Sequence, residues 1–117
     1  MSWHNIGATD CLVANSGVCA LVKNQQVAIF YLPQNECPLF AVGNYDPIGK
    51  ANVLSRGIIG SFSNKFVVAS PLYKQHFCLE TGQCFEDESI QVPVFDIKIE
   101  DGNVFINAEP KAIAAVA

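Results

Sequence analysis

The chain has 117 residues, half of them hydrophobic, and a formal net charge of −4. This length is typical of one domain with one core. The acidic balance and the absence of a Lys/Arg cluster in the sequence argue against nucleic acid or an anionic membrane surface as a partner. Charged residues make up 15% of the chain, below the ~25% of an average domain. A face covered by a partner would explain this, and so would an ordinary β-rich domain.

The first half of the chain predicts short strands. Residues 17–22 and 26–31 are β-rich runs around the polar turn 23–25, a pattern that predicts a hairpin. Residues 39–42 form another apolar run, which leads directly into Asp46. Residues 52–57 have room for one or two helical turns at most, with the glycine at position 57 as their stop.

The second half continues in the same way. Residues 65–69 predict a strand that leads into Ser70, and residues 75–79 and 83–85 predict a tight hairpin in which Gly82 is available for positive φ. The apolar alternation changes phase beside Pro93, which predicts a bulge or bend. The pair Asp101-Gly102 predicts a two-residue turn before a last strand at 104–106.

Many short strands separated by turns predict an all-β fold, a small sandwich or barrel of several antiparallel strands. We assign residues 1–107 to this domain and the Ala-rich residues 108–117 to a C-terminal tail, either frayed or a short helix. No apolar run reaches the ~20 residues of a membrane helix. The first five residues lack the basic start and apolar stretch of a secretory signal, so we expect a cytoplasmic location.

Five cysteines occur, an odd number, and none belongs to a Cys-x-x-Cys pair. Their spacing fits no zinc or iron–sulfur signature, and a cytosolic location favours free thiols. Cys78 and Cys84 flank the predicted turn at 81–82, so a functional dithiol is an alternative to reduced packing residues. The five are Cys11, Cys19, Cys37, Cys78 and Cys84.

Two segments of the chain resemble the metal-binding loops of a Rieske domain. A Rieske [2Fe–2S] cluster is held by two Cys and two His, one of each from each loop. Asp46 and Ser70 stand at the Cys positions of the pattern, and Ile48 and Tyr73 stand at the His positions. Isoleucine has no donor atom and serine has no thiolate, which excludes iron–sulfur ligation. The residues retained from the pattern are Pro47, Pro71 and Phe77.

A closer resemblance rests on Ser-Gly-Val-Cys-Ala-Leu at 16–21, Val-Leu-Ser-Arg-Gly-Ile-Ile at 53–59 and Val-Ala-Ser-Pro-Leu-Tyr-Lys-Gln at 68–75. These segments are similar to those of the small subunits of cytoplasmic NAD(P)H-dependent assimilatory nitrite reductases. The resemblance covers roughly residues 3–106. It implies an accessory subunit without a redox centre, not catalytic in isolation. It also implies a large-subunit partner with FAD, an iron–sulfur cluster and siroheme, which reduces nitrite to ammonium in nitrogen assimilation.

In a Rieske domain the two loops meet at one tip, so we expect this tip to be the docking surface for the large subunit. Prolines would keep the loops stiff, and Tyr and Arg are residue types that dominate interface energetics. An alternative is that Tyr73 fills the space of the cluster as a core residue. The interface candidates are Pro47, Arg56, Pro71, Tyr73 and Lys74.

Other sites are less favoured by the sequence. The oxygens of Asp46, Ser70 and Tyr73 are too few for calcium, and an Asp before Pro is more often a surface turn residue. His76 is more readily a solvated strand residue than a general base. The run at 86–88 predicts a solvated acidic turn, which could offer charge to a basic patch on a partner. We therefore assign no catalytic, cofactor-binding or metal residue.

Two function classes remain open. The first is the accessory subunit of a nitrite reductase, and the second is an independent Rieske-like interaction module attached to another oxidoreductase. An independent redox enzyme is disfavoured because the chain has no Gly-x-Gly-x-x-Gly motif and no ligand cluster.

Overall fold

Strands dominate the computed structural model, which describes residues 3–35, 38–62, 65–72 and 74–110. The all-β prediction is confirmed: no α-helix occurs in these ranges. The elements are β1 (Trp3–Ala8), η1 (Thr9–Cys11), β2 (Ser16–Val22), β3 (Gln25–Tyr31), β4 (Leu39–Gly43), β5 (Tyr45–Asp46), β6 (Ala51–Asn52), η2 (Leu54–Arg56), β7 (Ile58–Phe62), β8 (Lys65–Ala69), β9 (His76–Cys78), β10 (Val94–Glu100) and β11 (Asn103–Pro110).

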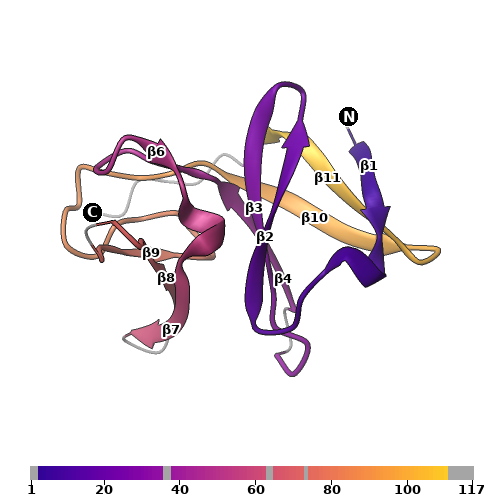
Figure 1. Ribbon diagram of the computed structural model, residues 1–117, viewed down its shortest axis with the longest axis horizontal. Helices are drawn as coiled ribbons and strands as arrows, with labels where there is room; N and C mark the ends of the chain where they lie inside the picture. Colours follow the sequence, from indigo (N-terminus) through magenta and orange to yellow (C-terminus); the bar gives the residue numbers. More distant parts are fainter. Residues whose placement is uncertain (1–2, 36–37, 63–64, 73, 111–117) are drawn as a thin grey trace.

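The larger sheet has the strand order β1-β11-β10-β4-β3-β2, and all its pairings are antiparallel. It curls into a half-barrel, so that its two edge strands, β1 and β2, come into contact. A smaller sheet, β7-β8-β9, lies beside it, and β5 and β6 form a separate two-stranded ribbon (Figure 1).

The hydrophobic core has two parts, which share the central strands of the larger sheet. One part joins this sheet to β8 and β9 and includes Phe30, Leu54 and Phe77. The other part fills the inside of the curl and includes Ile29 and Phe95. Alternate residues of β3 enter different parts, which explains why residues 27–30 form a continuous apolar run rather than an alternating one.

The predicted turns are confirmed by their backbone angles. Lys23 and Asn24 have φ values of 47° and 64°, and Asp101 and Gly102 have 53° and 76°. Positive φ at both central residues is the signature of the type I′ turn, whose twist matches that of the flanking strands. Gly82 also adopts positive φ, at 79°. The short helical segment η2 ends as predicted, because the N–H of residue 57 bonds to the Leu54 carbonyl at 3.0 Å.

Several features differ from the sequence-based picture. Strands β1 and β7 were not predicted, and the predicted bend near Pro93 takes the form of a register shift between Phe95 and Ile97. Strand β11 continues to Pro110, three residues into the segment assigned to the tail, and Ala108 is buried. Residues 111–117 lie outside the described residues, so the nature of the tail stays a prediction. Among the described residues, no helix is long and apolar enough to cross a membrane.

Candidate functional site

The first loop is closed by its own aspartate. Asp46 ends β5 and is completely buried, although we predicted a surface position for it. Its Oδ1 accepts hydrogen bonds from the backbone N–H groups of Ile48 at 2.8 Å and Gly49 at 3.1 Å. The N–H of Lys50 donates to the Asp46 carbonyl at 2.7 Å. Asp46 is therefore a turn residue, as predicted, but one whose carboxylate organises the loop from inside.

The second loop is built around Ser70, which is also buried. The Ser70 N–H donates to the Gln75 carbonyl at 2.9 Å, and the Lys74 N–H donates to the Ser70 carbonyl at 3.0 Å. Lys74 stands where the Rieske pattern has glycine, and it adopts a left-handed φ of 61°. The backbone conformation that favours glycine is thus retained with a lysine in place.

A direct hydrogen bond joins the two loops. The Ser70 hydroxyl donates to Oδ2 of Asp46 at 2.5 Å. The loops also pack closely at Gly49, where a Cβ would lie 2.4 Å from Cδ1 of Leu72. Both residues of the bond stand at Cys positions of the Rieske pattern. The side chains that would bind the cluster bind one another instead.

These residues do not fit an iron–sulfur cluster. The Asp46 carboxylate and the Ser70 hydroxyl are already bonded to each other, and Ile48 packs against the core. Neither Asp46 nor Ser70 supplies the thiolates that hold such clusters. Within the described ranges, no group of three or more Cys, His, Asp or Glu side chains is arranged to hold a metal ion. Tyr73, at the remaining His position, lies outside the described residues.

The described interface candidates lie in the two loops and at the end of η2. Pro47 is half-buried in the first loop, whereas Pro71 and Lys74 are exposed in the second. Arg56 is exposed at the end of η2, two residues before the start of β7 at Ile58. Their role as contacts for a partner stays a prediction.

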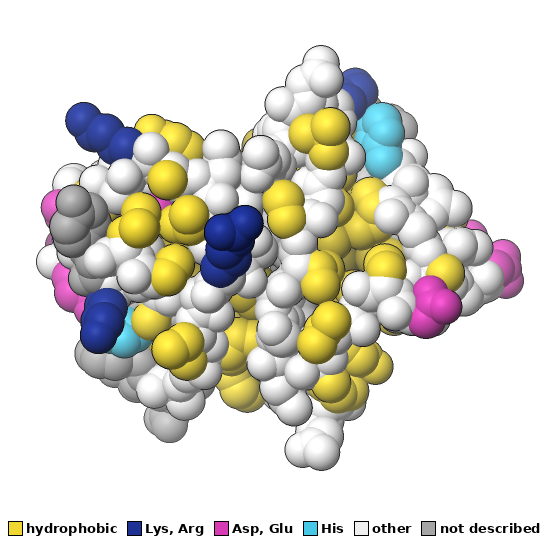
Figure 2. Space-filling view, in the orientation of Figure 1, with side chains coloured by type: hydrophobic (Ala, Val, Ile, Leu, Met, Phe, Trp, Pro, Cys, Tyr) yellow, Lys and Arg dark blue, Asp and Glu magenta, His cyan; other side chains and the backbone are white. Residues whose placement is uncertain are grey.

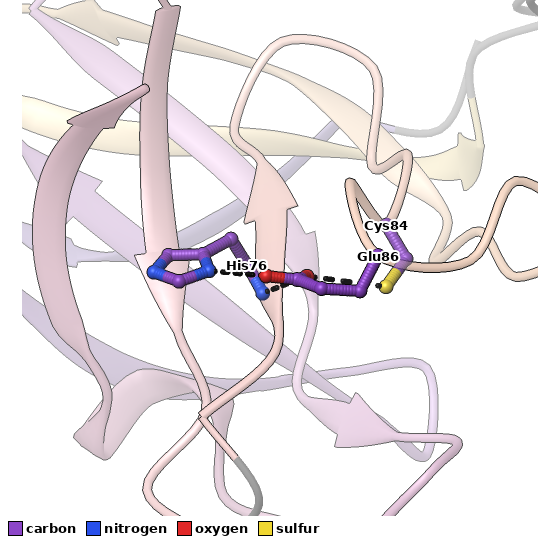
Figure 3. A network of polar contacts seen from close by, with 3 residues as sticks. All are labelled: His76, Cys84 and Glu86. Carbon is purple, nitrogen blue, oxygen red and sulfur yellow. Dashed lines mark hydrogen bonds and ion pairs between the residues drawn. The ribbon is translucent and has the colours of Figure 1, made fainter. Parts of the chain in front are cut away.

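Next to the second loop, a polar network that the sequence did not reveal fixes His76 (Figure 3). Its Nδ1 lies 2.6 Å from Oε2 of Glu86, and its backbone N–H donates to Oε1 at 2.7 Å. The Cys84 thiol also donates to Oε1, at 3.8 Å. His76 is therefore half-buried and held, not simply solvated. In the sequence, the one signal for the His76–Glu86 pair is that the two residues lie ten positions apart around a predicted hairpin.

The electrostatics of this network favour a structural role. Burial pushes the pKa of Glu86 up, but the hydrogen bonds and charge of His76 outweigh it, so the pKa lies below its ordinary value. Burial raises the pKa of the Cys84 thiol. A thiol that stays protonated is a poor nucleophile, and the raised pKa of Cys84 favours the protonated form.

The thiols are consistent with the prediction from the sequence. The four described cysteines are free, with Cys11 and Cys19 exposed and Cys78 and Cys84 buried. Cys78 and Cys84 carry free thiols, and the choice between a functional dithiol and reduced packing residues stays a prediction. Cys37 lies outside the described residues.

Known proteins are similar to this chain in both sequence and fold. The family model of the Rieske-like [2Fe-2S] domain matches residues 2–107. The nitrite reductase (NADH) small subunit of Salmonella typhimurium is 45% identical over 102 residues, 87% of this chain and 94% of that protein. The Escherichia coli K12 small subunit is 42% identical over the same shares. The solved structure of the E. coli protein NirD superposes with a TM-score of 0.80 at 40% identity, covering 90% of this chain and 94% of that one.

A further relative places the same unit inside a longer polypeptide. The nitrite reductase [NAD(P)H] large subunit of Klebsiella oxytoca is 32% identical over 104 residues. The match covers 89% of this chain and only 11% of that protein. On the full-length agreement with the small subunits and on the family match, the chain belongs to the Rieske-like family, in the group of nitrite reductase (NADH) small subunits.

Proposed function

We propose that this chain is the accessory small subunit of a cytoplasmic NAD(P)H-dependent nitrite reductase, which reduces nitrite to ammonium for nitrogen assimilation. The chain binds the large subunit and is not catalytic alone. The redox groups, namely FAD, an iron–sulfur cluster and siroheme, belong to that large subunit. The observation that carries this proposal is a sequence identity of 42–45% to small subunits over 94% of their length.

The loop chemistry supports a role without electron transfer. The two Cys positions of the Rieske pattern are occupied by a hydrogen-bonded Asp46 and Ser70, so the shape of the loops persists without a donor set for iron. The tip formed by the two loops is the surface we propose for docking. Losing the cluster removes the need for Cys and His, but not the need for a shaped contact surface.

The decisive experiment is reconstitution with the large subunit. We expect the two purified proteins to co-elute as a complex, and we expect nitrite-dependent NAD(P)H oxidation to rise when the small subunit is added. An equal concentration of an unrelated Rieske ferredoxin is the control. Absence of a complex together with unchanged activity would overturn the proposal and favour an independent Rieske-like module attached to another oxidoreductase.

Substitution of Tyr73 separates docking from core filling. If Tyr73 docks, Tyr73→Ala leaves the melting temperature nearly unchanged and weakens binding to the large subunit by about 1–3 kcal/mol. If it fills the core, the same change lowers stability by roughly 3 kcal/mol or more. Intact binding and activity in the double variant Tyr73→Ala, Lys74→Glu would exclude the tip as the docking surface.

A further inference from the structure

Charge is unevenly divided along this acidic chain. Residues 47–79 contain Lys50, Arg56, Lys65 and Lys74 and no Asp or Glu, which gives this segment a charge of +4. The rest of the chain holds the other three basic residues and all eleven acidic ones, which gives −8. The positive segment starts directly after Asp46 and includes both loops. The carboxylate that precedes the segment, Asp46, is buried and hydrogen-bonded within the loops.

Three of these four cations are exposed around the loops. Lys50 ends the first loop, Lys74 ends the second, and Arg56 closes η2. Among the described residues, the ion pairs involve Lys65, Lys98 and His76 but none of these three cations. Lys65 is 3.6 Å from Glu80 and is thereby compensated. Lys50, Arg56 and Lys74 therefore carry the exposed positive charge of the segment that no described ion pair compensates.

Exposed apolar side chains lie among these cations. Ile58 is 77% exposed at the start of β7, and Leu72 is 45% exposed in the second loop. Ile58 pairs with Ala69, the residue before Ser70, and Leu72 touches the first loop at Gly49. Figure 2 shows hydrophobic side chains on both halves of the molecule, and on the half that carries β6 to β9 Lys and Arg side chains lie among them. We call Lys50, Arg56, Ile58, Leu72 and Lys74 the basic tip.

We propose that the basic tip docks on the large subunit through an apolar contact surrounded by acidic side chains of that subunit. The inference rests on the proposed function and adds the chemistry of the partner surface. Apolar side chains inside a charged rim are the usual anatomy of a protein interface, and complementary rim charges set association rate and specificity. Solubility depends on the net charge of the chain, which is −4. It does not require that unpaired cations lie in one segment.

The comparison with a longer relative favours the large subunit as the partner of this surface. In the Klebsiella oxytoca relative, a unit like this one and the large subunit are one polypeptide, so the two operate at short range. The acidic turn at 86–88 borders the second loop through the His76–Glu86 pair. The three unpaired cations would repel a basic partner surface and attract an acidic one.

The test is the salt dependence of binding, measured by titrating the labelled small subunit with large subunit. We expect the Kd of the wild type to rise steeply between 20 and about 300 mM NaCl, because rim charges are screened beyond the Debye length of ~10 Å at 0.1 M. The triple variant Lys50→Glu, Arg56→Glu, Lys74→Glu should bind on the order of tenfold or more weakly at low salt. Its salt dependence should reverse, because salt screens the repulsion between the new glutamates and the acidic rim. The control variant Lys23→Glu reverses one charge in the β2–β3 turn, outside residues 47–79. It should bind like the wild type.

The outcomes separate this inference from the proposed function. A complex whose Kd changes neither with salt nor in the triple variant would contradict docking through the basic tip. The proposed accessory role would still hold. No complex under any condition would overturn both. Equal weakening by Lys23→Glu would show that net charge acts, not the tip. Self-association of the small subunit, abolished by the triple variant, would replace the large subunit with a second copy. Thermal melting of each variant confirms that folding is retained.

Discussion

Asp46 and Ser70 illustrate how a ligand pair can be replaced by a structural pair. Both are small polar residues at positions where the family pattern has cysteine, and they lie 24 residues apart in sequence. Burial of a carboxylate is costly unless each oxygen has a donor. Here Oδ1 receives two backbone N–H groups and Oδ2 receives the serine hydroxyl. The sequence identified these positions, but it could not show that the two side chains satisfy each other.

Removing the hydroxyl tests the contribution of this bond. Ser70→Ala leaves Oδ2 of Asp46 buried without its donor, and we expect a loss of about 2 kcal/mol in the free energy of unfolding. Urea denaturation measures this loss. Ser61→Ala, at an exposed position on β7, is the matched control and should change stability little. An equal midpoint for Ser70→Ala and Ser61→Ala would show that the bond adds nothing.

The Glu86 carboxylate predicts a pH dependence of stability. Its pKa in the folded chain is lower than the ordinary 4.5. A lowered pKa stabilises the fold above the ordinary value, and that contribution disappears as the pH falls through the folded-state value. Because Glu86 is 43% exposed, screening limits the effect to about 0.5 kcal/mol.

The measurement compares Glu86→Gln with the wild type at pH 6 and pH 3. We expect the variant to be less stable at pH 6 and the difference to shrink toward pH 3, as the pH falls through the lowered pKa of Glu86. Glu88→Gln, an exposed neighbour in the same turn, is the control. If the difference between Glu86→Gln and wild type were the same at both pH values, the His76–Glu86 pair would not be its source.

At the scale of elements, the sequence predicted best where turn chemistry was strong. The β2–β3 and β10–β11 hairpins were found because short polar turns separate β-rich runs, and both turns adopt the backbone angles that this pattern requires. Strand β1 was missed because it is a half-buried edge strand with mixed polarity and a register shift after Asn5. Strand β7 was missed because its first residue, Ile58, and Gly60 and Ser61 are all exposed, so little apolar alternation marks it.

The alternation of strand faces predicts which thiols react. Cys19 is exposed on the outer face of β2 and Cys11 is exposed in η1, whereas Cys78 and Cys84 are buried around the β9 hairpin. We expect maleimide to modify Cys11 and Cys19 rapidly in the native protein, and Cys78 and Cys84 only after denaturation. Peptide mass analysis after timed labelling assigns each site. Rapid native labelling of Cys84 would contradict its burial.

At the scale of the whole molecule, the curled sheet and the small sheet hold two loops at one end. The Rieske-like architecture was predicted from the loop spellings and the order of strands, and the family match over residues 2–107 confirms it. The sequence shows the +4 charge of residues 47–79, but only the fold shows that Lys50, Arg56 and Lys74 end the two loops and η2 as exposed side chains.

The donor set of the loops predicts a purified protein without iron. We expect colourless protein after anaerobic expression, with neither iron nor acid-labile sulfide in stoichiometric amount, because Ile48 and Ser70 cannot supply imidazole and thiolate. Iron and sulfide analysis beside a visible spectrum checks this. A Rieske ferredoxin prepared in parallel is the positive control. Stoichiometric iron with visible absorption would contradict the structural account of the loops.

The bond between Asp46 and Ser70 has a consequence for how the subunit matures. A loop tip held by a metal cluster reaches its final shape only after the cell delivers the metal, since binding and folding are coupled. A tip held by a hydroxyl and a carboxylate reaches its shape as soon as the chain folds. The shape of the two loops is thereby independent of iron availability.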